Sequence, residues 1–240
     1  MIYKLIIVLM ILFSTLFSIK AQFSIGINAG YNINHLETNI SNRSYTKNTN
    51  ENGYNYGLKL SYHLTHVLNM QTGLDLMQKN YSVIRTGDYL GIYEIFDNSY
   101  FQIPITAQFK LFGIRRMSFL INTGVYGAYW FYSKITGTIP NILNSTETIS
   151  NDGQITQNLT LTNFVEKYQF NSKVDNRFEY GFNTGLELNY KVNNNHSIFG
   201  GLNFYQSLTD QQKKYMVNQI SKRNQTLCIA IGYSYKFFTD

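Results

Sequence analysis

The chain has 240 residues, of which 14% are charged and 16% are aromatic. This composition excludes collagen-like and disordered chains. The sole cysteine, Cys228, excludes an internal disulfide and a cysteine-rich zinc site.

Residues 1–21 have the features of a secretory signal peptide. Lys4 supplies the positive start, residues 5–17 form an apolar run, and Ala21 is suited to cleavage before Gln22. The run is about 13 residues long, whereas a membrane-spanning helix needs roughly 20, so we expect an exported chain. Without the two lysines of this segment, 18 basic residues (20 minus 2) face 14 acidic ones. That excess is too small to indicate nucleic-acid binding.

Apolar and polar residues alternate with a period of two through most of the remaining chain. In the first stretch Ile25 and Ile27 share one face, while Gly26 and Asn28 share the other. Such alternation predicts β-strands. In chain order we expect eight strands, at 23–33, 54–64, 67–81, 101–111, 117–131, 178–190, 198–208 and 227–237. The fifth is the least regular, because Leu120 and Tyr126 fall on its polar face.

Two architectures produce this alternation: a soluble lipocalin-like barrel with an apolar interior, and a membrane barrel with an apolar outside. The polar faces are rich in Gly, Ser, Asn and Gln, and the chain has too few charges to cover a water-facing surface. Aromatic residues such as Tyr54, Tyr62, Phe101 and Phe109 lie near strand ends, as in interfacial girdles. We therefore expect an all-β fold, an eight-stranded up-and-down antiparallel transmembrane barrel in the outer membrane of a Gram-negative cell.

The connections between these strands alternate in length. Long polar segments occur at 34–53, 82–100, 132–177 and 209–226, with short ones between them. Long external loops and tight periplasmic turns are typical of outer-membrane barrels, which places both ends of the barrel domain, 22–240, on the periplasmic side. Residues 159–161 and 164–170 either extend as a hairpin above the membrane or add two strands to make a ten-stranded barrel.

Three segments resemble a known family. They are the opening strand 23–31 (FSIGINAGY), the strand 100–110 (YFQIPITAQFK) and the closing segment 231–237 (IGYSYKF). Together with a signal that ends Lys-Ala-Gln, they resemble the PorT-like small outer-membrane β-barrels of Bacteroidota. The resemblance implies an eight-stranded outer-membrane barrel in a family whose members mostly lack an assigned activity, and whose name-giving member is linked to protein secretion.

Several charged residues fall on the face expected to line the lumen. They are Lys59, Asp75, Lys79, Lys110, Glu179, Glu187 and Lys236. Opposite charges should pair inside a narrow barrel, because an unpaired buried charge is costly. We therefore expect a structural network of salt bridges that plugs the lumen, with a conducting pore as the alternative.

The sequence carries no Gly-x-Ser-x-Gly elbow, His-Glu-x-x-His motif or P-loop, so we expect no catalytic residue, no cofactor and no metal. His63, His66 and His196 fall at short turns, where metal binding is the alternative to solvated turn residues. Pro104 has no backbone N–H to donate to a neighbouring strand, and we expect a β-bulge there.

The leading function is a structural or surface-interaction protein, an accessory of the cell envelope without catalysis. Its expected contacts are outer-membrane lipid, the barrel-assembly machinery during insertion and a protein partner at loop 132–177. The alternatives are a narrow channel or transporter for small solutes and, third, a soluble lipocalin-like carrier of apolar ligands.

Overall fold

The computed structural model describes residues 22–38, 45–149, 155–217 and 219–237, so the expected signal peptide, 1–21, lies outside the described residues. The described chain is almost entirely strand. In order the elements are β1 (Gln22–Thr38), β2 (Thr46–His63), β3 (Leu68–Gln78), β4 (Tyr81–Arg85), the 3-10 helix η1 (Gly87–Tyr89), β5 (Tyr93–Ile114), β6 (Met117–Ile149), β7 (Ile155–Lys167), β8 (Phe178–Lys191), β9 (His196–Ser207) and β10 (Lys222–Lys236). Within the described ranges, no helix has the length and apolarity needed to cross a bilayer.

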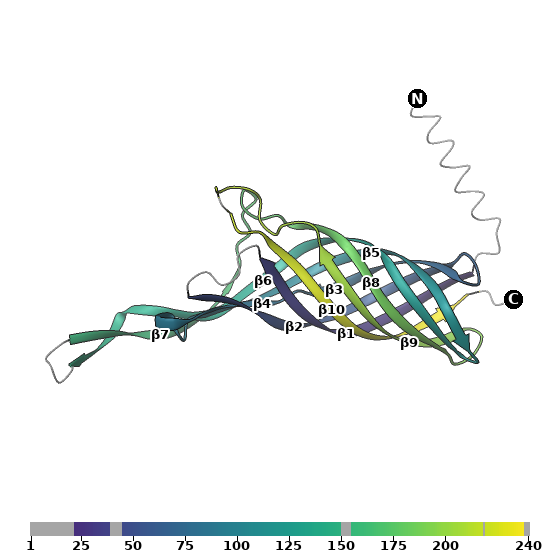
Figure 1. Cartoon of the computed structure of the whole chain (residues 1–240), viewed down its shortest axis with the longest axis horizontal. Helices are drawn as coiled ribbons and strands as arrows, with labels where there is room; N and C mark the ends of the chain where they lie inside the picture. The colour runs from purple at the N-terminus through teal and green to yellow at the C-terminus, as the bar shows by residue number, and fades with distance from the viewer. Residues whose placement is uncertain (1–21, 39–44, 150–154, 218, 238–240) are drawn as a thin grey trace, which may run out of the picture.

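Eight of these strands close into a ring, as expected from the sequence (Figure 1). The ring runs β1-β2-β3-β5-β6-β8-β9-β10, and β10 returns to pair antiparallel with β1. The closing register joins Ser24 to Lys236 and Thr38 to Lys222. The first strand therefore begins beside the end of the last one, at the same end of the barrel as the short turns.

The apolar residues face outward, and this confirms the membrane-type arrangement. Leu58, Ile105 and Ile229, from three different strands, are 55%, 54% and 47% exposed. The buried residues of the same strands are mostly Asn, Gln, Ser and Thr. A lipocalin-like barrel has the opposite polarity, so that alternative is wrong.

Aromatic side chains gather near both ends of the lipid-facing wall. Phe101 stacks on Phe131 at 4.3 Å toward one end, and Phe112 stacks on Phe119 at 4.5 Å toward the other. On β2, Tyr54 and Tyr62 lie eight residues apart, which is roughly 26 Å along a strand. This spacing matches an apolar band roughly 25 Å tall between two aromatic girdles.

The strands at the end opposite the short turns continue far beyond this band. Segments 34–53, 82–100 and 132–177, expected as loops, are to a large extent strand, and β6 alone has 33 residues. β4 pairs with β2 and β5 above the ring, and β7 pairs with β6 as a projecting hairpin (Figure 1). Neither enters the ring, so the ten-stranded alternative is wrong. The polar composition of these segments misleads because both faces of a strand outside a bilayer can be wet.

The bulge expected at Pro104 is absent from the described ladder. The β3–β5 pairs Thr72↔Ile105 and Asp75↔Gln102 keep one register, and only the pairs between them are missing. The Thr72 hydroxyl instead donates to the Pro104 carbonyl at 2.9 Å. The proline removes a hydrogen bond without shifting the strand.

Candidate functional site

The lumen holds the candidate site, a column of charged and polar side chains along the barrel axis. The inner face of β8 sets its order, because Glu179, Asn183 and Glu187 follow one another at four-residue spacing on one buried face. Each glutamate accepts a lysine from the opposite wall, and a small cavity lies between the two levels.

The first ion pair joins Lys79 Nζ to Glu179 Oε1 at 2.5 Å, with side chains only 1% and 5% exposed. Tyr126 donates its hydroxyl to the same oxygen at 2.8 Å, and Asn224 Nδ2 donates to Glu179 Oε2 at 2.6 Å. Lys79 also donates to Gln102 Oε1 at 2.9 Å. A buried ion pair is tolerated when such hydrogen bonds replace the lost water, and here both partners have them.

An interruption between β3 and β4 sets the place of Lys79. Here the backbone amide of Lys79 donates to the backbone carbonyl of Asn98 in β5. In return, the side-chain amide of Asn98 donates to the backbone carbonyl of Lys79. Asn80 accepts the Asn98 amide. These amide contacts replace the missing ladder and hold the lysine side chain in the lumen, over the rings of Tyr126 and Tyr100.

The second ion pair lies toward the short-turn end. Lys59 Nζ donates to Glu187 Oε2 at 2.8 Å, and Gln108 Nε2 donates to Glu187 Oε1 at 3.0 Å. The ammonium of Lys59 also lies 3.9 Å from the centre of the Phe199 ring. Lys59 is 21% exposed, so this level is wetter than the first.

A cavity of about 60 Å³ separates the two levels. Asp75, Asn122, Asn183, Tyr205 and Cys228 are among the residues that line it. Polar cavities of this size hold a few water molecules. The buried thiol of Cys228 contacts Asn55 Oδ1 at 3.3 Å.

Aromatic residues close the lumen at the end opposite the short turns. Trp130 is stacked against Tyr100 at 5.9 Å and against Tyr168 at 5.7 Å, and Phe170 meets it edge-on at 4.9 Å. The Arg177 guanidinium lies 4.2 Å from the centre of the Phe170 ring. We call Trp130, Tyr168, Phe170 and Arg177 the cap.

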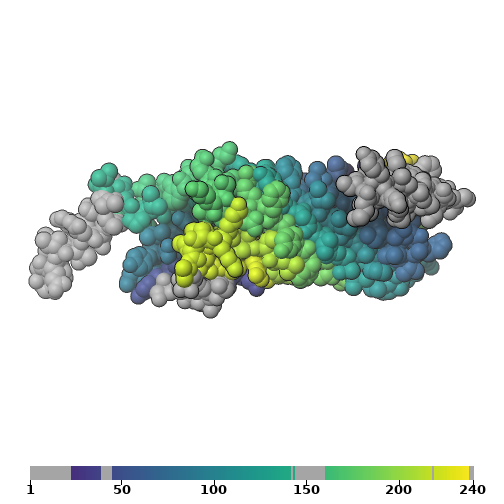
Figure 2. Space-filling model, turned by 90° about the horizontal axis from the view of Figure 1, so that it is seen from above, coloured from purple at the N-terminus to yellow at the C-terminus, as the bar shows by residue number. Residues whose placement is uncertain are grey.

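A knob of two segments, 168–176 and 209–217, holds the cap in place. The segments lie side by side in the space-filling view (Figure 2), and the Lys213 amide donates to the Val174 carbonyl at 2.7 Å. Tyr168 donates its hydroxyl to Asp175 at 2.8 Å. Burial and this hydrogen bond raise the pKa of Tyr168 above its usual range, so the hydroxyl keeps its proton and its bond.

The seven residues predicted to face the lumen fall into three groups. Two ion pairs join Lys59 to Glu187 and Lys79 to Glu179. Asp75 lines the cavity between them, and Lys110 and Lys236 line a larger cavity at the short-turn end. The sequence analysis missed Tyr126, Asn224 and the cap, although the irregular inward position of Tyr126 was the signal for the first.

The histidines do not form a cluster. His63 and His66 line the short-turn cavity, whereas His196 contacts Tyr233 and Tyr235. In the part of the chain that the structure describes, no three His, Cys, Asp or Glu side chains form a group able to hold a metal ion.

Comparisons with known proteins agree with this architecture. A family model described as "Outer membrane protein beta-barrel domain" matches residues 17–213. No protein of curated function is significantly similar in sequence.

Similar solved structures include Neisserial surface protein A, with 9% identity over 90% of this chain and 97% of that one and a TM-score of 0.47. They also include OprG from Pseudomonas aeruginosa, with 12% identity over 90% and 96% and a TM-score of 0.49. The outer membrane protease OmpT from Escherichia coli has 8% identity over 90% and 97%, with a TM-score of 0.49.

Proposed function

Since the chain belongs to the outer membrane protein beta-barrel domain family, and its barrel therefore lies in an outer membrane, we propose that it is a closed, non-catalytic barrel that presents a surface to protein partners. The observation that carries this proposal is the combination of a plugged lumen with strands that continue beyond the membrane band. Two ion-pair levels and an aromatic cap fill the axis. A lumen filled in this way supports a structural role more than transport.

The sheet formed by β4, β7 and the outer ends of β2, β5 and β6 is the proposed interaction surface. Its exposed apolar residues include Leu143 of β6 and Val165 of β7, and Leu90 is exposed in the adjoining turn between β4 and β5. β7 pairs with β6 on one side only, at the end of the strand order. An edge strand with exposed apolar side chains can take up a further strand from a partner.

The orientation in the membrane is part of the proposal. β1 begins and β10 ends at the short-turn end, and short turns are periplasmic in barrels of this kind. We assign both ends of the barrel to the periplasm and the projecting sheet to the cell surface. The aromatic residues of the last strand are then available to the barrel-assembly machinery, and the outward apolar wall contacts outer-membrane lipid.

A narrower assignment follows the resemblance in the sequence. The strand around Pro104 and the opening and closing segments support membership of the PorT-like barrels of Bacteroidota, with an accessory role in the envelope. Comparison of genomic neighbours is the direct test, since an accessory of protein secretion should lie beside secretion components.

Conductance separates this proposal from a narrow channel. The purified chain, inserted into planar bilayers, should give no steady current steps at moderate voltage, because charged side chains and rings block the axis. Glu179→Ala is the matched opening variant, since it removes the acceptor of three hydrogen bonds. Steady ion-selective steps from the unaltered chain would establish the channel instead.

Partner capture tests the surface role. Pro140 pairs with Leu161 in the β6–β7 ladder, so residues 141–160 can be replaced by Asn-Gly, which favours a two-residue hairpin turn. This shortened chain should keep its heat-modifiable migration on gels and lose partners that the full chain captures from cell envelopes. A control that replaces 213–217 by Gly and Ser should retain them. Equal capture by the shortened and full chains contradicts the assignment.

A further inference from the structure

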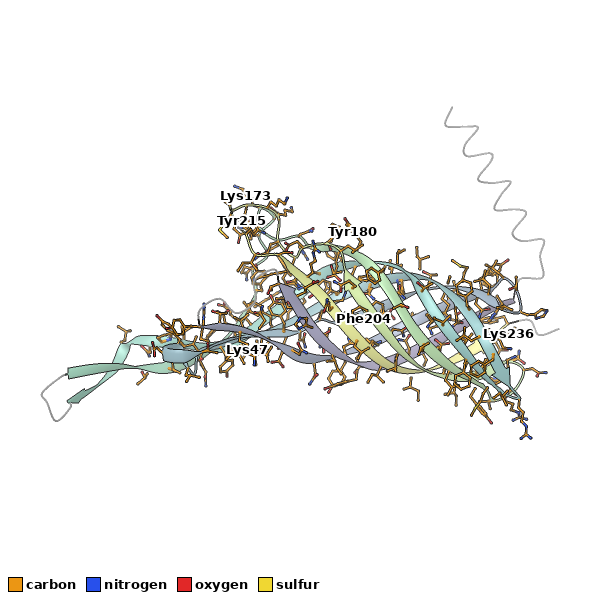
Figure 3. The ribbon with its side chains drawn as sticks, viewed as in Figure 1. Lys47, Lys173, Tyr180, Phe204, Tyr215 and Lys236 are labelled. Atoms are coloured by element: carbon orange, nitrogen blue, oxygen red, sulfur yellow. The ribbon has the colours of Figure 1, made fainter. Side chains whose placement is uncertain are left out.

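The cavity of about 60 Å³ between the two ion-pair levels has a lining that the plugged-barrel function does not explain. Residues from all eight ring strands contribute to it. It therefore lies inside the barrel wall, between the short-turn end, marked by Lys236, and the knob, marked by Lys173 (Figure 3). We call it the inner cavity.

Two amide oxygens in the lining of the inner cavity receive no hydrogen bond. Asn122 and Asn183 are each 3% exposed, and neither side-chain oxygen has a partner among the residues that the structure describes. The nitrogen of each amide is already used, because Asn122 Nδ2 donates to Asn203 Oδ1 at 3.4 Å and Asn183 Nδ2 donates to Thr106 Oγ1 at 3.2 Å. A buried oxygen without a partner is costly, so both oxygens require a species bound in the cavity.

Asp75 adds a carboxylate to the same lining. It is 7% exposed, and the side-chain amide of Asn28 donates to it. Lys59 and Lys79 act on it electrostatically, but the ammonium of each already binds a glutamate, at 2.8 and 2.5 Å. Gly57 leaves the room that this carboxylate occupies, since a Cβ there would overlap Asp75 Oδ1. The wall thus holds a buried carboxylate whose nearest cations are bound elsewhere.

The described lining of the inner cavity carries one excess negative charge. Its charged residues are Lys59, Asp75 and Glu187, one positive and two negative. Both oxygens of Glu187 already accept hydrogen bonds, one of them from Lys59, so Asp75 is the charge left to balance. Lys110 and Lys236 line the separate cavity at the short-turn end. Because an uncompensated buried charge is costly, a counter-charge in the inner cavity would stabilise the folded barrel.

We propose that the inner cavity binds one sodium-sized alkali-metal cation, held by Asp75, Asn122 and Asn183, with water completing its shell. Carboxylate and carbonyl oxygens are the ligands that hard cations take, and alkali-metal ions are bound by such carbonyl oxygens in membrane proteins. One carboxylate with neutral amides matches a single positive charge. In the described chain no three His, Cys, Asp or Glu side chains group around a metal position, which disfavours a transition metal. This inference does not depend on what the projecting sheet binds.

The cation reaches the inner cavity from the short-turn side. Lys59, Gln71, Glu187 and Phe199 line both this cavity and the one at the short-turn end, and Lys59 is 21% exposed. On the other side the first ion pair and the cap close the lumen. The lysines around the entrance slow the approach of a cation, so the chain should be refolded in each salt before it is measured.

The test is urea unfolding of the full chain in uncharged phosphatidylcholine vesicles, with sodium chloride exchanged for choline chloride at constant ionic strength. Choline is too large for the inner cavity. Once sodium exceeds its dissociation constant, each tenfold increase should raise the folding equilibrium constant about tenfold, the slope for one bound ion. Asp75→Asn should remove this dependence. Asn183→Ala takes away one oxygen without changing the charge, should weaken the dependence, and guards against misfolding of the first variant.

Asp88→Asn is the matched control, because Asp88 is an exposed carboxylate of η1 and its loss changes the net charge equally. This variant should keep the full sodium dependence. Equal stability in sodium and choline overturns the proposal, since water or a proton then satisfies the cavity. Sodium dependence that survives in Asp75→Asn, or disappears in the control, also overturns it. Stabilisation by calcium at concentrations far below those of sodium would refute the single charge assigned to the ion.

Discussion

The ion pair between Lys79 and Glu179 offers the sharpest test of how the barrel interior is stabilised. Glu179→Leu removes the carboxylate and leaves the Lys79 ammonium, 1% exposed, with Gln102 as its remaining hydrogen-bond partner. Breaking a buried ion pair from one side costs about 3–5 kcal/mol. Lys79→Met should cost less, because Glu179 keeps the Tyr126 and Asn224 donors.

The double variant Lys79→Met/Glu179→Leu is the decisive measurement. It removes both charges and fills the space with apolar groups of similar size, which is often close to neutral for a buried pair. We therefore expect it to be more stable than Glu179→Leu alone by about 2–3 kcal/mol, so that the costs of the two single variants do not add, as is usual for residues in contact. Urea unfolding in lipid vesicles, followed by the fluorescence of Trp130, reports it directly, since the chain has one tryptophan and it lies in the cap.

The same cycle at Lys59 and Glu187 is the matched control. Lys59 is 21% exposed beside the larger cavity at the short-turn end, so water can solvate the charge left behind and the coupling should be below about 1 kcal/mol, as for solvent-accessible pairs. Strict additivity of the Lys79 and Glu179 variants, or equal coupling at the two levels, would refute the view that the first ion pair is a dry, mutually dependent plug.

Three further predictions concern the wall and the cap. Gly124→Ala should sharply reduce the folded fraction on heat-modifiable gels, because the added Cβ would overlap the Ile105 carbonyl oxygen. Gly127→Ala should not, because the space around Gly127 is open, and equal folded fractions for the two variants would contradict this prediction. Leu58→Lys should destabilise the inserted barrel by about 2–4 kcal/mol if it lies near the bilayer midplane, whereas Leu90→Lys, exposed in the turn between β4 and β5, should be neutral. Similar urea midpoints for both would place Leu58 outside the hydrocarbon. Phe170→Ala should expose Trp130 to iodide quenching, because Phe170 contacts its ring at 4.9 Å; unchanged quenching would show that the cap does not close the lumen.

The sequence was sufficient for the ring and its polarity. Alternation with period two placed Leu58 and Ile105 outward because lipid requires an apolar face on every strand that crosses it. The same rule explains why the sequence did not predict the strands that continue beyond the membrane. Strand β6 continues for some 18 residues past the predicted end at residue 131, but both of its faces are free of lipid there, and the alternation no longer marks it.

The site was predictable by residue but not by pairing. The alternation of each strand identified Lys79 and Glu179 as facing the lumen. They lie 100 residues apart in the sequence, so only the register of the strands around the ring decides which charges lie at the same height. The position of Lys79 depends further on the interruption between β3 and β4, which Asn98 and Asn80 hold by amide contacts. Side-chain contacts of that kind leave no periodic trace in a sequence.

The continuity of β6 has a mechanical consequence. One strand runs from Met117 through the barrel wall to Ile149 in the hairpin, paired with β5 and β8 over its lower part. A tension applied near the hairpin tip acts along that strand and is shared by many parallel hydrogen bonds in shear. The hairpin tip is therefore held at a fixed distance from the membrane-spanning ring, at the end opposite the short turns.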